Sequence, residues 1–377
     1  MRVAQILTQK YDVVCTNPPY MGGSGMNATL STYVKKNFPD SKSDLFACFM
    51  EKCGQLIKRN GLYAMITQHA WMFLSSYEKL REKLKMHSIV DMAHLGARAF
   101  DEIGGEVVQT TAFVSCGRRV ADFKGTYVRL VDIVGEWEKE AAYRSGNHRY
   151  TAKQENFSKI PGSPIAYWVS ENLLNCFDKF SKINDCFSSC SGTSTGNNEK
   201  YLRLWHEVDN IKIEFNQNKW YPCNKGGAYR KWAGGSEYVM DWENDGNRIK
   251  NEPKAFLRNI SKIFLPGITW SKLGSSLTSF RYFSNGYICE SIGCGLFGKN
   301  DILLALAMLN SIVATYTLSI INPTLGRQPG YIGSVPYFVD EQQKPIIKYL
   351  VKENINISKA DWDSFETSWD FEGHPLV

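Results

Sequence analysis

The chain has 377 residues, of which 43% are hydrophobic and 22% are charged. This is the composition of a globular protein long enough for more than one domain, and it excludes a disordered, collagen-like or coiled-coil chain. The net charge is +6, with a positive excess in residues 1–189 and 190–336 and a negative excess in residues 337–377. A polyanionic partner is compatible with this charge but is not required by it.

The ten cysteines do not have the spacing of a disulfide framework or of a zinc knuckle. No Cys-x-x-Cys pair is present, and the nearest neighbours in sequence are Cys186/Cys190, Cys289/Cys294 and Cys48/Cys53. We therefore expect free thiols in a cytoplasmic protein, and no bound metal.

Two segments bear on membrane association. The N-terminal residues lack the long apolar run of a signal peptide. Residues 302–321 are long and apolar, but they include polar residues such as Asn310 and Ser319. This pattern favours a buried helix followed by a strand over a transmembrane segment, so we expect no membrane partner.

The first part of the chain begins with a β-branched run at residues 11–16, which predicts a strand. Two prolines end it at once, in the tetrapeptide Asn17-Pro18-Pro19-Tyr20, because proline cannot donate to a sheet ladder. Residues 21–42 are rich in Gly, Ser and Asn and predict a mobile loop. A helix is then expected from an N-cap at Ser43 to a stop at Asn60-Gly61.

Three further strands are predicted at residues 62–67, 88–92 and 110–115, with a helix opened by a capping box at Ser75 and running to about Met86. Alternating strands and helices indicate an open, wound α/β sheet. Ligands in such sheets bind at the carboxyl ends of the strands, where the Asn17–Tyr20 turn would lie.

The amino-acid composition changes after about Tyr167, where tryptophan and glycine become frequent. The turn-forming residues Pro161-Gly162-Ser163-Pro164 suggest a domain boundary at this position. We expect one domain over residues 1–165, a second over residues 166–336, and an acidic tail or the start of a further segment over residues 337–377.

The Asn17-Pro18-Pro19-Tyr20 turn carries the strongest chemical signal. Asn17 offers a side-chain acceptor, the prolines leave carbonyl acceptors free, and Tyr20 offers a flat ring. Two acceptors can hold a planar amino group by its hydrogens and bring its lone pair forward for attack on an electrophilic methyl group. A plain proline-rich turn after a strand is the structural alternative.

This turn resembles the catalytic motif of the amino-methyltransferases that use S-adenosylmethionine, and in particular the adenine-specific DNA methyltransferases. Residues 43–46 with Phe49, residues 60–67, and the stretch from Gly105-Glu106 to residues 111–114 are similar to their following elements. The resemblance implies a catalytic role for Asn17, Pro18, Pro19 and Tyr20. It implies cofactor contacts for Asn17, Asp44, Phe46 and Phe49, although core packing is as good an explanation for the two phenylalanines.

The second part of the chain resembles the target recognition domains of type II restriction–modification proteins, and the whole chain is similar to the large adenine methyltransferase of BREX phage-defence systems. The matching pieces are residues 192–198, 220–222, 226–227, 267–270 and 322–327. The resemblance implies a Rossmann-like methyltransferase sheet followed by an α+β recognition domain, and double-stranded DNA as partner. The candidate DNA contacts are Thr195, Asn197, Lys225, Arg230, Lys231, Arg281 and Arg327, each of which has an ordinary surface or loop position as its alternative.

The sequence departs from the family in one respect. In the family, a glycine-rich cofactor loop and an acidic ribose partner precede the catalytic turn. Only sixteen residues precede Asn17 here, and none forms a Gly-x-Gly. We therefore expect an incomplete methyltransferase sheet with an unpaired apolar edge, in a fragment of a larger enzyme or one part of a split enzyme. The expected partner is the missing N-terminal region or a second subunit.

Three other functions remain as alternatives. A chain without the cofactor loop could be an inactive DNA-binding module. Similar tetrapeptides also serve methylation of ribosomal RNA guanine and of protein glutamine, but the second part of the chain favours DNA. A nuclease has little support, since no metal-binding carboxylate cluster followed by lysine is evident.

Overall fold

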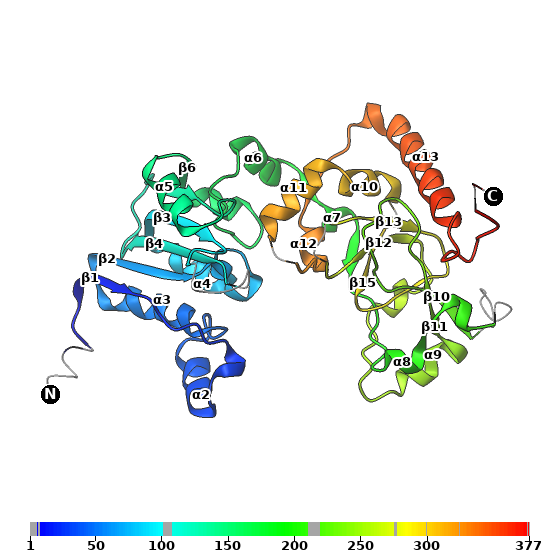
Figure 1. The fold of residues 1–377 in the computed structure, drawn as a ribbon, viewed down its shortest axis with the longest axis horizontal. Helices are drawn as coiled ribbons and strands as arrows, with labels where there is room; N and C mark the ends of the chain where they lie inside the picture. The colour runs from blue at the N-terminus through cyan, green and yellow to red at the C-terminus, as the bar shows by residue number, and fades with distance from the viewer. Residues whose placement is uncertain are drawn as a thin grey trace. The chain divides into compact units, whose positions relative to one another are not determined.

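The computed structural model describes residues 6, 8–100, 108–209, 219–274, 277–298, 300–323, 325–374 and 376. The chain divides into two compact units, Met1–Asp178 and Lys179–Val377 (Figure 1). The division falls C-terminal of the turn-forming residues Pro161–Pro164, and residues 337–377 lie within the second unit. The described fold is a mixed α/β fold.

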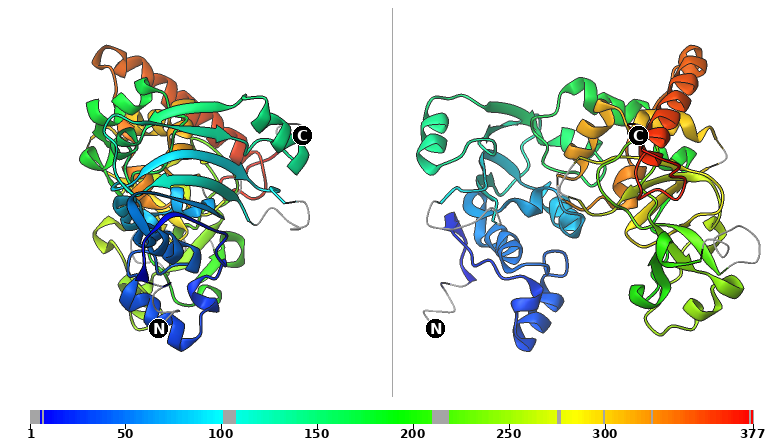
Figure 2. Two further views of the ribbon diagram at one scale, coloured as in Figure 1. Left: turned by 90° about the vertical axis from the view of Figure 1, so that its left-hand side faces the viewer. Right: turned by 45° about the vertical axis from the view of Figure 1, so that its right-hand side comes forward.

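The first unit is built on a six-stranded mixed sheet of order β1-β2-β4-β3-β5-β6. The pairs β1–β2 and β3–β5 are parallel and the others are antiparallel (Figure 2, left). The strands are β1 (Tyr11–Thr16), β2 (Ile57–Gln68), β3 (Ser88–Gly96), β4 (Thr110–Cys116), β5 (Lys124–Arg129) and β6 (Arg149–Lys153). The helices are α2 (Ala28–Asn37), α3 (Leu45–Leu56), α4 (Glu78–Leu84), α5 (Glu136–Arg144) and α6 (Glu171–Lys179).

The strands predicted at residues 11–16, 62–67, 88–92 and 110–115 are confirmed. The prediction of a loop over residues 21–42 was wrong, because α2 occupies Ala28–Asn37 with the side chain of Asn27 accepting from the Leu30 N–H. The helix predicted from Ser75 begins at Glu78 instead, after a short 3₁₀ turn at Ser75–Tyr77.

Asn60-Gly61 was wrongly predicted to stop a helix, since α3 ends at Leu56 and Gly61 lies inside β2. The glycine is needed there for another reason. A Cβ atom at position 61 would lie 2.9 Å from the backbone oxygens of both Tyr11 and Asp12. The glycine therefore allows β1 to approach β2 closely.

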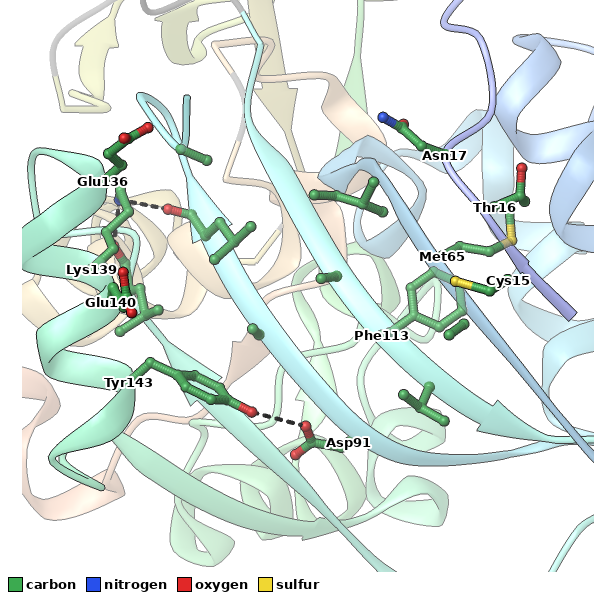
Figure 3. Close-up of a pocket in the computed structure, with 18 residues that line it drawn as sticks. Cys15, Thr16, Asn17, Met65, Asp91, Phe113, Glu136, Lys139, Glu140 and Tyr143 are labelled. Carbon is green, nitrogen blue, oxygen red and sulfur yellow. Dashed lines mark hydrogen bonds between the residues drawn. The ribbon is translucent and has the colours of Figure 1, made fainter. Parts of the chain in front are cut away.

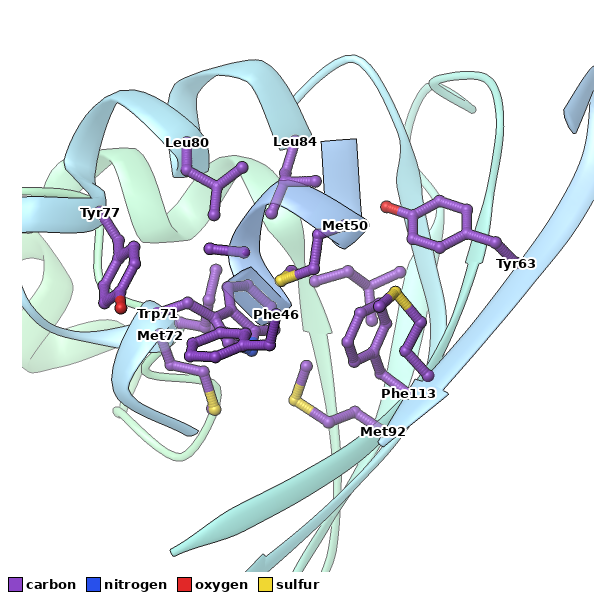
Figure 4. Close-up of a cluster of buried hydrophobic side chains, with 14 of the residues drawn as sticks. Phe46, Met50, Tyr63, Trp71, Met72, Tyr77, Leu80, Leu84, Met92 and Phe113 are labelled. Carbon is purple, nitrogen blue, oxygen red and sulfur yellow. The ribbon is translucent and has the colours of Figure 1, made fainter. Parts of the chain in front are cut away.

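One face of this sheet is covered by α3, α4 and the 3₁₀ turn at His69–Met72 (Figure 4). Residues of β2 and β4 that point to this face, including Tyr63, Met65 and Phe113, are buried against Phe46 and Met50 of α3. Burial of so many large side chains supplies the main stabilisation of the first unit.

The opposite face and the β1 edge are apolar but open. Val13 is 61% exposed, Cys15 is exposed, and Leu62 of β2 is exposed as well. Within the described residues β1 pairs only with β2, so its other edge presents free backbone groups. The unpaired apolar edge expected from the sequence is therefore present.

The second unit contains two four-stranded sheets of order β14-β10-β11-β9 and β13-β12-β15-β8, and a two-stranded ladder of β16 with β7. The strands are β7 (Ser181–Lys182), β8 (Ser188–Cys190), β9 (Leu202–Leu204), β10 (Trp220–Asn224), β11 (Tyr238–Asp241), β12 (Gly267–Ser271), β13 (Arg281–Phe283), β14 (Ile288–Cys289), β15 (Gly293–Phe297) and β16 (Pro336–Tyr337). The helices are α7 (Ile183–Cys186), α8 (Asn198–Tyr201), α9 (Glu243–Lys250), α10 (Ile302–Leu309), α11 (Ile312–Ile321), α12 (Pro329–Gly333) and α13 (Lys344–Asp363).

Residues 302–321 were predicted as a helix followed by a strand, and the second half of that prediction was wrong. Both halves are helical, because Ser311 caps α11 by accepting from the Ala314 N–H. Among the described residues no single helix meets the length and apolarity of a membrane span; α10 and α11 meet them only jointly, with a 72° bend between them.

Two histidines contact each other in the first unit, one half-buried (His69) and one buried (His94). His69 Nδ1 lies 2.9 Å from His94 Nε2, and His94 Nδ1 lies 3.2 Å from the Tyr167 hydroxyl. Burial lowers the pKa of His69 to about 4 and places the pKa of His94 well below its usual range, with His69, Arg129 and Lys139 adding repulsion at His94. Both rings are therefore neutral in the folded protein at neutral pH.

The histidine pair predicts acid sensitivity. The unfolded chain binds protons at these rings as the pH falls through about 6.5, whereas in the folded chain His69 does so only near pH 4 and the pKa of His94 is also well below its usual range. The free energy of unfolding should therefore decrease by ~1–2 kcal/mol per histidine between pH 7 and pH 5. Urea denaturation across this range measures the decrease, and the His69→Gln variant should show a smaller decrease than the control His374→Gln. Equal slopes in both variants would refute the assignment.

Candidate active site

The Asn17-Pro18-Pro19-Tyr20 turn lies at the carboxyl end of β1. The parallel ladder pairs Thr16 with Met65 of β2, which fixes where the chain leaves the sheet. Asn17 is exposed, Pro18 is buried and Tyr20 is half-buried. Within the described part of the chain the Asn17 side-chain amide makes no hydrogen bond, so both of its polar atoms are available to a ligand.

Tyr20 is held by aromatic packing. Its ring meets Phe46 edge to face, with 5.9 Å between centroids and 78° between planes. Burial, and to a smaller extent the Asp44 carboxylate, raises the pKa of the Tyr20 phenol, so Tyr20 is neutral. The other side of a half-buried ring in this position can stack on a planar ligand.

Asp44 joins the turn to helix α3. Its Oδ1 accepts from the Met21 N–H at 2.9 Å and from the Phe46 N–H at 3.3 Å. Asp44 is thus the N-cap of α3, which corrects the expectation that Ser43 would be the cap. The carboxylate is only 8% exposed, so it fixes the backbone directly after Tyr20 to the rigid start of the helix.

The two phenylalanines predicted as cofactor contacts differ in position. Phe46 is completely buried in the core of the first unit. Phe49 is half-buried and packs against the same core. Packing accounts for what both rings do here, and their cofactor role stays a prediction.

A cavity of 630 Å³ lies beside the turn on the open face of the sheet. Its floor is formed by small and apolar side chains such as Cys15, Ala64 and Val114, and α5 forms its far wall (Figure 3). Asn17 stands at its rim. The sequence reasoning did not single out the α5 residues, which lack a recognised motif.

Lys139 is the one cation among the described residues that line the cavity, and its ammonium already donates hydrogen bonds to backbone carbonyls. Its ammonium donates to the carbonyl oxygens of Leu95 at 2.7 Å and Leu130 at 2.8 Å, and also to that of Ile133. Burial lowers its pKa. Lys139 therefore ties α5 to the ends of β3 and β5, and its three N–H donors are all used by backbone carbonyls.

The resemblance of the Asn17–Tyr20 turn to methyltransferases implies S-adenosylmethionine as the methyl donor. Such a cofactor needs donors or a cation for its carboxylate and an acidic partner for its ribose. The cavity offers apolar walls, the occupied Lys139, and carboxylates at Asp91, Glu136 and Glu140. The described residues that line the cavity do not form a complete cofactor site.

Five of the predicted DNA contacts in the second unit have structural partners. Thr195 is buried and its hydroxyl donates to Asn198 Oδ1, while Asn197 caps α8. Lys231 donates to the Asn310 carbonyl at 2.7 Å. Arg327 donates to the Gly274 and Leu325 carbonyls, and Arg230 pairs with Asp361 at 2.9 Å.

The remaining two predicted contacts, Lys225 and Arg281, are different. Among the described residues no carboxylate pairs with the Lys225 ammonium, which lies 4.2 Å from the centre of the Tyr238 ring. Arg281 is 3% exposed, and its side chain makes one hydrogen bond within the described residues, to the Gly226 carbonyl at 3.2 Å. Two pieces of the family resemblance, Gly105-Glu106 and Thr324, lie outside the described residues.

The first unit thus combines a mixed sheet with an Asn-Pro-Pro-Tyr turn at the carboxyl end of β1. Residues 3–100 match the model of the Eco57I restriction-modification methylase family. The chain is 42% identical to the adenine-specific methyltransferase PglX of Lacticaseibacillus casei (strain Zhang), covering 100% of this chain and 33% of that protein.

It is also 42% identical to the adenine-specific methyltransferase BrxX of Escherichia coli O9:H4 (strain HS), covering 99% of this chain and 31% of that protein. The chain thus spans about a third of the length of the curated relatives it matches. The recognised resemblance to such methyltransferases is confirmed.

Solved restriction–modification enzymes share the fold. The type IIL enzyme MmeI in complex with DNA matches with a TM-score of 0.60 at 12% identity, over 95% of this chain and 50% of that chain. A nuclease-deletion mutant of the type ISP enzyme LlaGI matches with a TM-score of 0.54 at 10% identity, over 95% and 42%. Both likenesses extend over most of this chain, which confirms the predicted fold class.

The Asp44 cap gives a prediction for stability. Asp44→Ala removes the acceptor of two backbone N–H groups and should lower the free energy of unfolding by about 1–2 kcal/mol. Asp44→Asn keeps an oxygen at the same position and should retain most of the stability. Urea denaturation of the three proteins measures the difference; an alanine variant as stable as wild type would show that Asp44 does not anchor the turn.

Proposed function

We propose that this chain takes part in site-specific N6-methylation of adenine in DNA, in restriction–modification or phage defence. In this proposal the first unit supplies the turn that binds the target amine, and the second unit recognises DNA. The observation that carries it is the exposed Asn17 amide, free of partners in the described structure, next to the Tyr20 ring at the carboxyl end of β1. The naming of both relatives as adenine-specific methyltransferases supports it.

The chemistry assigned to the turn needs only acceptors and a ring. The Asn17 side-chain oxygen and a carbonyl of the proline turn accept the two hydrogens of the adenine amine, while Tyr20 stacks on the purine. Holding both hydrogens in this way brings the nitrogen lone pair forward. The methyl donor implied by the family, S-adenosylmethionine, supplies the electrophilic carbon when it is bound.

The target adenine must leave the duplex to reach this turn, at a cost of a few kcal/mol. Stacking on Tyr20 returns about 1–3 kcal/mol of that cost. Packing against Phe46 holds the Tyr20 ring in place before the base arrives, which lowers the cost of stacking the base on it. Contacts from the second unit to the DNA backbone supply the remainder, and these depend on salt.

The proposal includes a partner for the open side of the sheet. The exposed side chains of Val13 and Cys15 and the free edge of β1 call for a further strand and a covering element. We assign this role to a methyltransferase segment that carries the cofactor loop, either in a longer polypeptide or in a separate subunit. A DNA-binding module without activity is the competing function, favoured by the incomplete cofactor site.

Variants at Tyr20 and Asn17 test the proposed reaction. With the complete protein, duplex DNA and tritiated methyl donor, Tyr20→Ala should lower the transfer rate by about 10- to 100-fold, the loss of ~1–3 kcal/mol of stacking. Tyr20→Phe keeps the ring and should stay within a few-fold of wild type. Asn17→Ala should abolish transfer while leaving duplex affinity intact. Transfer by the Asn17→Ala protein at the wild-type rate would end the proposal.

The cofactor half of the proposal has its own test. Calorimetric titration of S-adenosylmethionine into the chain alone should show no micromolar binding, because the described residues that line the cavity offer its carboxylate no cation other than Lys139, whose donors are already used. Binding should appear when the segment that pairs with β1 is present, and Val13→Lys, which places a charge on the open face of β1, should weaken it. Micromolar binding to the isolated chain would contradict the assignment.

A further inference from the structure

The second unit contains a cationic cavity beside the Gly226-Gly227 turn. It has a volume of 350 Å³ and is lined by glycines, aromatic rings and four ionisable side chains. The ionisable side chains are Lys225, Arg230, Glu237 and Arg281. The exposed ring of Tyr229 and the ring of Trp362 also line it.

Arg281 is the unusual member of this group. It is 3% exposed, and within the described structure no carboxylate pairs with it. Its Nε is buried without a hydrogen-bond partner, and its guanidinium has only the Gly226 carbonyl as acceptor. A buried arginine normally has its charge and its donors matched, because an unmatched buried charge is costly.

The backbone is shaped around this guanidinium. Gly235 has φ +77°, and a Cβ atom there would lie 2.4 Å from Arg281 Nη1. Gly226 and Gly227 have φ +90° and +132°, and a Cβ atom at Gly227 would lie 3.5 Å from the same nitrogen. Any side chain at position 235 would displace the arginine, so the fold reserves this space for it.

The charge of the cavity can be counted from its contacts. Arg230 is neutralised by Asp361 and stacks on Trp362, with 5.1 Å between the guanidinium and the ring centre. Lys225 and Arg281 lack carboxylate partners in the described residues, and Glu237 offsets one of them. The excess of one positive charge matches the single negative charge of a phosphodiester.

We infer that the cavity lined by Lys225, the Gly226-Gly227 turn and Arg281 binds a backbone phosphate of DNA. The planar guanidinium fork suits phosphate oxygens, and Lys225 adds a point charge at the mouth. The inference deepens the proposed function, on which it rests, by selecting two of the seven predicted contacts.

The salt dependence of duplex binding tests this site. In wild type the logarithm of the affinity of the full chain for a duplex should fall linearly with the logarithm of salt concentration. Lys225→Gln should weaken binding uniformly across sequences and reduce the slope by about 1. Lys250→Gln, which removes the same charge from an exposed lysine paired with Asp245, is the matched control and should leave the slope unchanged.

Arg281 is tested by two substitutions, since removing a buried side chain can unfold a protein. Arg281→Gln should reduce the slope in the same way as Lys225→Gln, and Arg281→Lys should restore part of the affinity. Thermal unfolding of each variant shows whether it is folded. Because Lys225 is only half-buried, its variant keeps the inference falsifiable even where the arginine variants do not fold.

Inorganic phosphate distinguishes the source of the anion. Phosphate should raise the melting temperature of wild type more than chloride of equal ionic strength, and this difference should vanish in Lys225→Gln. If wild type binds the duplex and the Lys225 and Arg281 variants keep its slope, the inference is overturned while the proposed function stands. If phosphate stabilises the chain but wild type does not bind the duplex, DNA is not the occupant and the proposed function fails as well.

Discussion

The parallel pairing of β1 with β2 is the constraint on which the candidate site depends. It stops at Thr16, opposite Met65, and the next residue is Asn17. The pairing is possible because Gly61 lets the backbone of β1 approach without a side chain between the strands. Two prolines then prevent the strand from continuing, so the Asn17 amide is presented at the edge of the sheet instead of entering it.

A second fixed point lies on the other side of the turn. The Asp44 carboxylate caps α3 and also holds the Met21 N–H, so the chain is anchored within one residue of Tyr20. Phe46, in the first turn of the same helix, supports the Tyr20 ring. The turn is therefore held by a strand before it and a helix after it, and the group that would accept the amine is positioned before any ligand arrives.

Much of the first unit could be predicted from sequence, because β-branched runs bounded by Gly, Pro and Asn mark strands directly. The errors have physical causes. Asn60-Gly61 has the composition of a helix stop, but the glycine serves the close approach of β1, which depends on a residue far away in sequence. Helix α2 was missed because its Ser- and Thr-rich residues have weak helix propensity, and the Asn27 cap decides the outcome.

The functional residues of the second unit could be predicted only as a group. Seven polar or basic residues were candidates, and the sequence offered no way to rank them. The structure separates Lys231 and Arg327, which hold backbone carbonyls, from Arg281, which is buried and makes no ion pair with any described residue. That difference depends on tertiary packing around Gly235, which no local pattern reveals.

The central claim is that the turn after β1 grips the exocyclic amine of adenine. Mass spectrometry of nucleosides from the DNA of cells producing the complete protein tests it most directly, because the method identifies the base and the atom that is methylated. The account predicts N6-methyladenine with the wild-type protein and none with Asn17→Ala. Methylation on another base or atom, or N6-methyladenine that persists in the variant, would contradict it.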